Sequence, residues 1–354
     1  MTFEEGVRAE VEKYGGFINA HSHIDRSYVM DTRYVSHADM NAWDITGYSL
    51  EVKQHTTGAL HEGLAYTEES LRERISQGLE DCIRYGTSRI DSFIDTTADC
   101  IGTRALDIGL ELQEEYRDRI EFRVGAYPIF GFKDDKPERW DVFVDGAERA
   151  DFIGTLPERD ARRFHIGYRE HIRRILLLAN ELGNKEVHMH VDQTNNPDEN
   201  GTETLIEAAR WLRPYFEIYP KPVPTIWAVH SLSISSYSEE RFQRVVDGLL
   251  ETNIGVIACP TATLSNYQDR SILVPMHNSM TRLLDLALAG VPVRLGSDNV
   301  QDFFLPNGTF DMYHEVVAAS NILRFYNYST WAKIVSGRRL NEVDKMKIRG
   351  VYSS

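Results

Sequence analysis

The chain has little of what marks several large classes of protein. It contains three widely spaced cysteines, Cys82, Cys100 and Cys259, and this odd number argues against both a disulfide framework and a cysteine zinc site. We therefore expect all three to be small buried side chains. No apolar run approaches the roughly 18 residues that span a bilayer. The acidic N-terminus lacks the basic and apolar regions of a signal peptide, so a cytoplasmic location is predicted.

Positive charge is also scarce. The sequence has 39 lysines and arginines against 54 aspartates and glutamates, a formal net charge of -15. This charge would repel a phosphate backbone, and no basic stripe interleaved with aromatic residues offsets it. We expect a small-molecule substrate, and neither nucleic acid nor a membrane as a partner. The sequence leaves open whether the chain forms a homo-oligomer.

No internal repeat and no low-complexity linker divides the chain. Instead, short apolar runs alternate with longer amphipathic segments. Eight runs predict strands, at 16–21, 87–94, 120–127, 150–155, 185–191, 224–230, 254–259 and 291–297. The segments between them predict helices, for example at 68–85, 103–116, 168–182, 202–212, 238–251 and 279–289.

Eightfold alternation of strand and helix is typical of an α/β fold of the (β/α)8 TIM type. Such barrels reach this length as one unit with a single core, so we predict one domain over residues 1–354. Residues 25–67 are too many for an ordinary connection and predict a lid over the mouth of the barrel. The histidines of this lid segment, His37, His55 and His61, are expected at the surface.

The carboxyl ends of four predicted strands carry side chains that bind metals: His21 and His23 in the first, His188 and His190 in the fifth, His230 in the sixth and Asp298 after the eighth. Side chains at alternate positions of a strand point the same way, so a His-x-His pair can reach one ion. A lone histidine beside an apolar run is more often a hydrogen-bonded core residue. Four such strand ends favour one shared metal site. Zinc is the default ion for nitrogen and oxygen ligands of this kind, with ferrous iron as the alternative.

These motifs resemble those of the amidohydrolase superfamily, and within it the cytosine deaminase-like branch that includes triazine aminohydrolases. The matching pieces are FINAHSHIDRS at 17–27, HVDQ at 190–193, VHS at 229–231 and GSDNVQD at 296–302, followed by Pro306 and Gly308. Their order and strand placement match over roughly residues 16–312. The resemblance implies a metallo-dependent hydrolase barrel that acts on carbon–nitrogen bonds, most directly as a deaminase.

The resemblance also implies roles for individual residues. His21, His23, His190 and Asp298 would bind one divalent metal ion, and His230 would contact the attacking water. His190 is preferred to His188 because Asp192 and the acid-rich segment behind it follow His190 in the register of the family. His188 would then lie one layer deeper in the barrel.

Three features depart from the family pattern. Gln193 stands where the family carries a glutamate that shuttles a proton, and an amide cannot exchange protons at neutral pH. Ile129 stands at the substrate-binding position where cytosine-specific members have a pyrimidine-binding glutamine, which argues against cytosine itself. The chain also begins too close to His21 and ends too soon after Asp298 for the β-sandwich that flanks most relatives.

A mechanism follows from these assignments as an expectation. A divalent ion held by imidazoles and a carboxylate lowers the pKa of bound water from about 15.7 towards 7. Asp298 would accept the proton of that water, and His230 would hold the resulting hydroxide. In the absence of the glutamate, Asp298 would also protonate the departing amine.

Substrate contacts are expected from polar residues near the strand ends. Gln193 offers a donor and an acceptor that would orient the substrate, and a Gln193→Ala variant with unchanged KM and turnover would contradict this. Arg26 would clamp a carboxylate or an enolate-like oxygen, unless it forms a salt bridge with a nearby acid. Asn299 and Asp302 would read the substrate edge, although an Asx turn also explains them.

Two other functions compete with deamination. A cyclic amide or lactam hydrolase would use the same site and release a ring-opened acid instead of ammonia. A catalytically reduced homologue would only bind its ligand, but it would have no physical need for so many buried ligand groups that repel one another.

Overall fold

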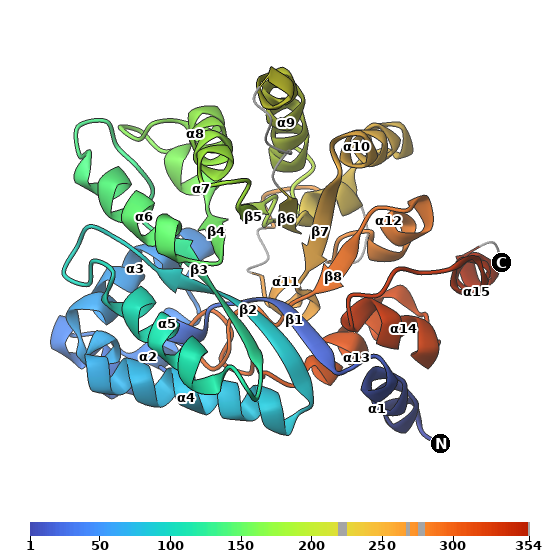
Figure 1. Ribbon diagram of the computed structural model, residues 1–354, viewed down its shortest axis with the longest axis horizontal. Helices are drawn as coiled ribbons and strands as arrows, with labels where there is room; N and C mark the ends of the chain where they lie inside the picture. Colours follow the sequence, from blue (N-terminus) through green and yellow to red (C-terminus); the bar gives the residue numbers. More distant parts are fainter. Residues whose placement is uncertain (219–224, 267–269, 275–279, 353–354) are drawn as a thin grey trace.

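A computed structural model describes residues 1–218, 225–266, 270–274 and 280–352. Eight parallel strands form one sheet in the order β1 to β8, each hydrogen-bonded to the next, and they curve into a barrel (Figure 1). The strands are β1 (Phe17–Ser22), β2 (Thr87–Asp95), β3 (Glu121–Tyr127), β4 (Phe152–Thr155), β5 (Glu186–Val191), β6 (Ile226–His230), β7 (Ile254–Ala258) and β8 (Val293–Leu295). The predicted (β/α)8 barrel is confirmed, and no second sheet occurs among the described residues.

Helices surround the barrel as predicted. Those that follow the strands are α4 (Glu68–Arg84), α5 (Arg104–Tyr116), α6 (Glu138–Arg149), α8 (Tyr168–Glu181), α9 (Gly201–Ile218), α10 (Glu239–Thr252) and α12 (Leu283–Ala289). The chain ends bring α1 (Phe3–Lys13), α13 (Met312–Leu323), α14 (Tyr328–Val335) and α15 (Glu342–Tyr352). The predicted element ends at 224 and 279 lie outside the described residues. No helix in the described part of the chain has both the length and the hydrophobicity to span a bilayer.

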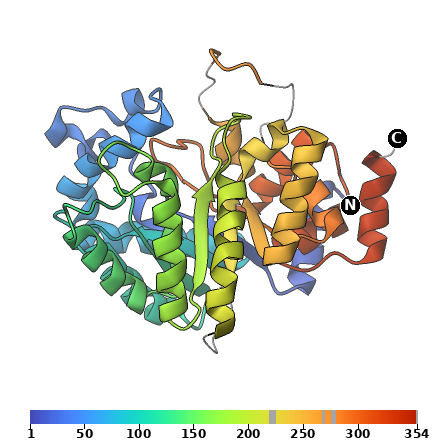
Figure 2. The same cartoon turned by 90° about the horizontal axis from the view of Figure 1, so that it is seen from above.

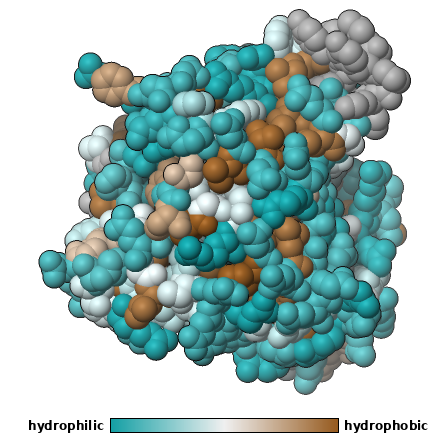
Figure 3. Space-filling view, turned by 60° about the vertical axis from the view of Figure 1, so that its left-hand side comes forward, coloured by the Kyte–Doolittle hydropathy of each residue, from teal (hydrophilic) through white to brown (hydrophobic). Residues whose placement is uncertain are grey.

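The helices pack on the barrel through one apolar face each. On α4, Leu71, Ile75 and Leu79 recur every four residues and are fully buried. The helix begins at its N-cap Thr67, whose side chain accepts a hydrogen bond from the Ser70 amide. The opposite faces are polar, and the surface seen in Figure 3 is mostly hydrophilic with scattered apolar side chains. The main core therefore lies between the barrel and its helices.

The seam between β1 and β8 closes beside the predicted metal ligands. Only a short bridge joins the two strands, with Asp298 N donating to the His21 carbonyl at 3.0 Å. Asn19 donates to the Ser297 hydroxyl at 2.8 Å and accepts from the Ser297 amide at 3.0 Å. A Cβ on Gly296 would lie 2.7 Å from the His21 Cβ, so this close approach requires glycine. The seam thus fixes β1 relative to Asp298.

The lid segment, residues 25–67, is helical and not an irregular loop. It contains α2 (Ala42–Ile45), α3 (Leu50–Glu62) and short 3-10 turns. Figure 2 shows these blue segments at one end of the barrel. His37 and His55 are exposed as expected, but the prediction for His61 is wrong because its side chain is buried. His61 binds Asp95 at 3.1 Å and Asp99 at 2.6 Å, and so ties α3 to the end of β2.

This tie predicts a pH dependence of stability. Burial opposes the charge on His61, but its hydrogen bonds to Asp95 and Asp99 raise its pKa to about 9. The unfolded chain has a histidine pKa of about 6.5. Between these values the folded state binds more protons, so stability falls as pH rises, by at most about 3 kcal/mol. The contribution is complete below about pH 6.5 and is lost above pH 9.

The measurement is urea unfolding at pH 6, 8 and 9.5 for wild type, His61→Gln and His55→Gln. His55 lies exposed on the same helix and serves as the control. We expect His61→Gln to be less stable than wild type at pH 6 and to approach it at pH 9.5. A difference from wild type that does not change with pH would show that the charge of His61 does not contribute.

Candidate metal centre and active-site cavity

Four of the predicted ligands meet at the mouth of the barrel. His21, His23, His190 and Asp298 are buried, and their ligand atoms all lie within 4.8 Å of one another. They come from the ends of β1 and β5 and from just after β8; β1 and β8 meet at the seam of the barrel, whereas β5 pairs with β4 and β6 (Figure 1). The structure therefore brings together side chains that are up to 277 residues apart in the sequence (298 − 21).

The spacing within this cluster fits a metal ion. Asp298 Oδ1 lies 3.4 Å from Nε2 of both His21 and His23, and the Nε2 atoms of His21 and His190 are 3.2 Å apart. Four ligands at about 2.0–2.2 Å from a zinc ion in tetrahedral geometry would be separated by roughly 3.3 Å. Three nitrogen donors and one carboxylate also suit zinc or ferrous iron. The residues present thus fit the predicted ion.

Three histidines of the site, His23, His190 and His230, are held in the neutral form that binds metals. Burial lowers the pKa of His23 and His190 well below the ordinary value, and the charge of neighbouring groups acts in the same direction. Burial also lowers the pKa of His230 to about 4. Asp298 behaves oppositely: burial would raise its pKa, but the hydrogen bond and charge of His21 keep it below the ordinary value. At neutral pH these three histidines are neutral and the Asp298 carboxylate is ionised.

The backbone at the site adopts a conformation that non-glycine residues rarely take. His230 has φ of 72° and Asp298 has φ of 59°, both in the left-handed region. Asp192, which follows His190 closely, has φ of 53°. Such residues cost of order 1–3 kcal/mol each and persist where the surroundings enforce them. These residues change the direction of the chain at the strand ends. There the His230 and Asp298 side chains face each other, with Nε2 of His230 3.8 Å from Oδ2 of Asp298.

The geometry favours His190 over His188 as the ligand from β5. His190 belongs to the cluster, whereas His188 lies deeper in the barrel and contacts Glu186 at 2.9 Å. Asp91 is close to both of these, and Arg89 binds Asp91 at 2.8 Å. This lower layer is therefore an ion-paired network inside the barrel.

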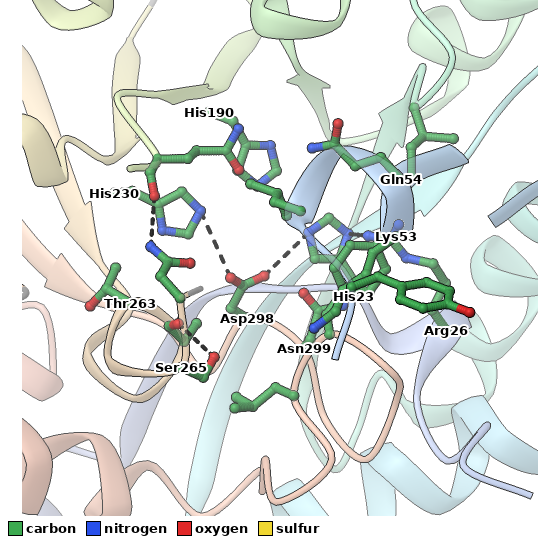
Figure 4. A pocket seen from close by; sticks show the side chains of 18 of the residues that line it. His23, Arg26, Lys53, Gln54, His190, His230, Thr263, Ser265, Asp298 and Asn299 are labelled. Atoms are coloured by element: carbon green, nitrogen blue, oxygen red, sulfur yellow. Dashed lines mark hydrogen bonds and ion pairs between the residues drawn. The ribbon is translucent and has the colours of Figure 1, made fainter. Parts of the chain in front are cut away.

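A cavity opens above the cluster, with an empty volume of about 720 Å³ that includes its opening to solvent. The predicted residues His23, Arg26, Ile129, His190, Gln193, His230, Asp298 and Asn299 all line it. Figure 4 shows Asp298 near its centre, between His23 and His230.

Known proteins share this architecture. A pterin deaminase of Rhizobium rhizogenes is 23% identical over 326 residues, 90% of this chain and 68% of the relative. The solved structure of 5-methylcytosine deaminase from Klebsiella pneumoniae matches with a TM-score of 0.75 at 20% identity, over 95% of this chain and 75% of that one. These similarities are in line with the resemblance noted in the sequence.

A protein without assigned function from Haemophilus influenzae is also similar, with 29% identity over 284 residues, 79% of this chain and 93% of that protein. No family model matches the chain. At these identities the similarity to the solved structures establishes the barrel fold alone. The reaction has to be argued from the site itself.

Two predicted substrate contacts differ in position. Asn299 lines the cavity and donates to the Asp302 carboxylate. Asp302 does not line it: its carboxylate accepts from the amides of Phe304 and Leu305, each at 2.9 Å. Asp302 therefore forms the turn that positions Asn299, and the Asx-turn alternative explains it better than direct substrate contact.

The cysteine prediction also needs correction. Cys82 and Cys259 are buried as expected, but Cys100 is exposed. Cys259 is more than a packing residue, since its sulfur lies within 4.8 Å of ligand atoms of His230 and Asp298. Burial raises the pKa of this thiol well above its ordinary value, so the free side chain is neutral.

Sequence reasoning missed several cavity residues. Lys53 and Gln54 reach the cavity from α3 in the lid segment, while Thr263, Ser265 and Asn266 reach it from the region after β7. The Asn266 side chain donates to the Gln193 carbonyl at 2.8 Å. The position of the last three just beyond a predicted strand was a usable signal. Lys53 and Gln54 gave no comparable signal, because their placement depends on how α3 packs.

Proposed function

We propose that this protein is a metal-dependent hydrolase of a carbon–nitrogen bond, and most directly a hydrolytic deaminase of a small nitrogen heterocycle or amidine-like compound. The observation that carries the proposal is the convergence of His21, His23, His190 and Asp298 at one point of the cavity, with His230 facing Asp298. The names of the relatives point the same way, since they include deaminases of pterin, 5-methylcytosine and guanine.

The cluster would hold one divalent cation, with zinc as the default and ferrous iron as the alternative. Such a cation supplies the acidity that ionises a coordinated water at neutral pH. The protein's own part is to keep His23 and His190 neutral and Asp298 ionised, which the pKa directions at this site favour. Burial of the cluster keeps other water away from it.

Asp298 is placed to move the proton and His230 to orient the nucleophile. Asp298 Oδ2 faces His230 Nε2 at 3.8 Å, so a water molecule between them would contact both. Asp298 accepts the proton of the water as its oxygen attacks the carbon that bears nitrogen. His230 stabilises the charge that develops on that carbon's substituents. The carbon–nitrogen bond then breaks, and ammonia leaves with the proton carried by Asp298.

Gln193 takes no part in this proton transfer. It lines the cavity, and its backbone carbonyl is fixed by Asn266, so its amide can donate to and accept from the substrate ring. Ile129, fully buried at the end of β3, offers an apolar wall in place of a polar pyrimidine contact. A heterocycle other than cytosine fits this pair better.

The test is an ammonia-release screen of pterins, purines, pyrimidines and triazines with protein stripped by chelator and then reloaded with zinc or ferrous iron. We expect ammonia release from at least one scaffold, lost on stripping and restored on reloading. Reloaded protein that binds metal but turns over no heterocycle would instead support the ligand-binding homologue.

One observation favours the lactam alternative. Among the described residues, Asp298 is the only carboxylate in the cavity lining. It is therefore the only such group that could donate a proton to a poor leaving group. Opening of a cyclic amide places less demand on that carrier, because the amine stays attached to the product. Mass spectrometry of the products separates the readings: ring opening adds water without release of ammonia.

A further inference from the structure

Two cations face the cavity with unused hydrogen-bond donors. Lys53, on the inner side of α3, is 8% exposed, and its ammonium has no hydrogen bond or ion pair with a described residue. Arg26, 3% exposed, follows β1 and contacts the His23 ring, while its Nε is buried without a hydrogen-bond partner. Buried cations of this kind are costly unless something pairs with them.

The carboxylates near these cations already hold other partners, although Asp25 and Asp95 each keep one oxygen without a hydrogen-bond partner. Asp95 lies 4.0 Å from Arg26 Nε and is hydrogen-bonded to His61 and Tyr66. Asp302 accepts from the amide of Asn299 and from two backbone amides. No carboxylate other than Asp298, which belongs to the metal cluster, lines the cavity within the described ranges. A divalent ion would add two more positive charges.

Burial and neighbouring carboxylates act in opposite directions on the pKa values of Arg26 and Lys53. Burial opposes the charge of Arg26, but Asp95 and Asp25 raise its pKa. Burial lowers the pKa of Lys53, and the charge of Asp302 acts in the other direction. Among the described residues that line the cavity, two side chains are cationic and one, Asp298, is anionic, although the chain as a whole carries a net charge of -15.

The two cations lie on one side of the reaction centre. Figure 4 shows Arg26, Lys53 and Gln54 together on one side of Asp298, with His230 on the other. A ring whose amino-bearing carbon faces Asp298 and His230 would present its far edge to Arg26 and Lys53. The aromatic rings of Tyr127 and Phe304 lie 5.8 and 5.3 Å from the Arg26 guanidinium carbon and form apolar walls beside it.

We propose that Lys53 and Arg26 form an anion-recognition wall, and that the substrate is a heterocycle with an acidic substituent, such as a carboxylate, on the edge remote from its amino group. This inference rests on the proposed function for the orientation of the ring. A guanidinium and an ammonium on one side of a water-poor cavity match a carboxylate in charge and in donor number. Lys53 is then a specificity-determining residue contributed by the lid segment.

The experiment measures equilibrium binding of product analogues, which cannot react further, to zinc-loaded protein by calorimetry. The matched pairs are uracil with uracil-6-carboxylate and lumazine with lumazine-6-carboxylate. For at least one pair we expect the carboxylate to bind wild type at least about 10-fold more tightly. Lys53→Met should remove most of this preference and leave the affinity for the uncharged member within about 2-fold, whereas Lys53→Arg should retain the preference.

Lys136→Met is the control, because Lys136 is exposed and lies outside the cavity. Urea unfolding of each variant shows whether it is folded. No carboxylate preference in wild type, or an equal loss of affinity for both members in folded Lys53→Met, would overturn the inference.

Failure of the proposed function looks different. Carboxylate preference without ammonia release from any heterocycle would leave the anion wall in place and contradict the deaminase. Ammonia release from uncharged heterocycles without any carboxylate preference would support the deaminase and contradict the anion-recognition wall.

Discussion

Asp298→Asn is expected to lower turnover by at least about 10³-fold. Asparagine has nearly the same shape but can neither accept the proton of the attacking water nor return it to the leaving amine, and general acid–base groups contribute about 10²–10⁴-fold. The loss of one negative ligand adds to this by weakening metal binding. No other carboxylate in the described cavity lining could substitute for it.

The measurement is ammonia release under saturating substrate, together with metal content per folded chain. Asp91→Asn is the control, because Asp91 is an equally buried aspartate of the same barrel but is paired with Arg89 in the lower layer. We expect Asp91→Asn to be less stable and yet to keep its metal. If Asp298→Asn retained more than a tenth of wild-type turnover, another group would have to carry the proton.

The second large effect separates the two histidines of β5. His190→Ala should lose most of its bound metal, and with it at least about 10³-fold of activity, because it removes one of the four converging ligands. His188→Ala should keep one ion per chain. Its cost appears in stability, about 1–3 kcal/mol, because Glu186 loses a buried hydrogen-bond partner.

Elemental analysis after dialysis and urea unfolding report the two effects separately for each variant. We expect His190→Ala to lose metal and His188→Ala to lose stability but keep its metal. Metal loss in His188→Ala with retention in His190→Ala would reverse the choice of ligand.

The barrel and the metal cluster were predictable because both depend on local periodicity. A strand alternates its side chains, so His21 with His23, and His190 with its neighbours, are assigned to a face by counting residues. Parallel strands in a barrel end at a common mouth, and this brings Asp298 to those histidines without knowledge of any loop. The eight predicted strands overlap the eight observed ones for the same reason.

The lid segment was predictable only in outline. Its length indicated a cover for the mouth, but whether a side chain of α3 faces the cavity or solvent depends on packing between distant parts of the chain. Lys53 and His61 lie on buried positions of this helix while His55 is exposed, and no strand-like alternation marks the difference. The expected surface position of His61 failed because its partners, Asp95 and Asp99, come from β2 and the turn after it.

The central claim is that one divalent ion sits among side chains from three strand ends. Anomalous scattering from a crystal of the zinc-loaded protein, recorded on both sides of the zinc absorption edge, locates that ion directly. The account predicts a single strong peak about 2.0–2.2 Å from ligand atoms of His21, His23, His190 and Asp298. A peak bound instead to Cys259, or to the Asp91, Glu186 and His188 group, or no peak at full zinc loading, would contradict it.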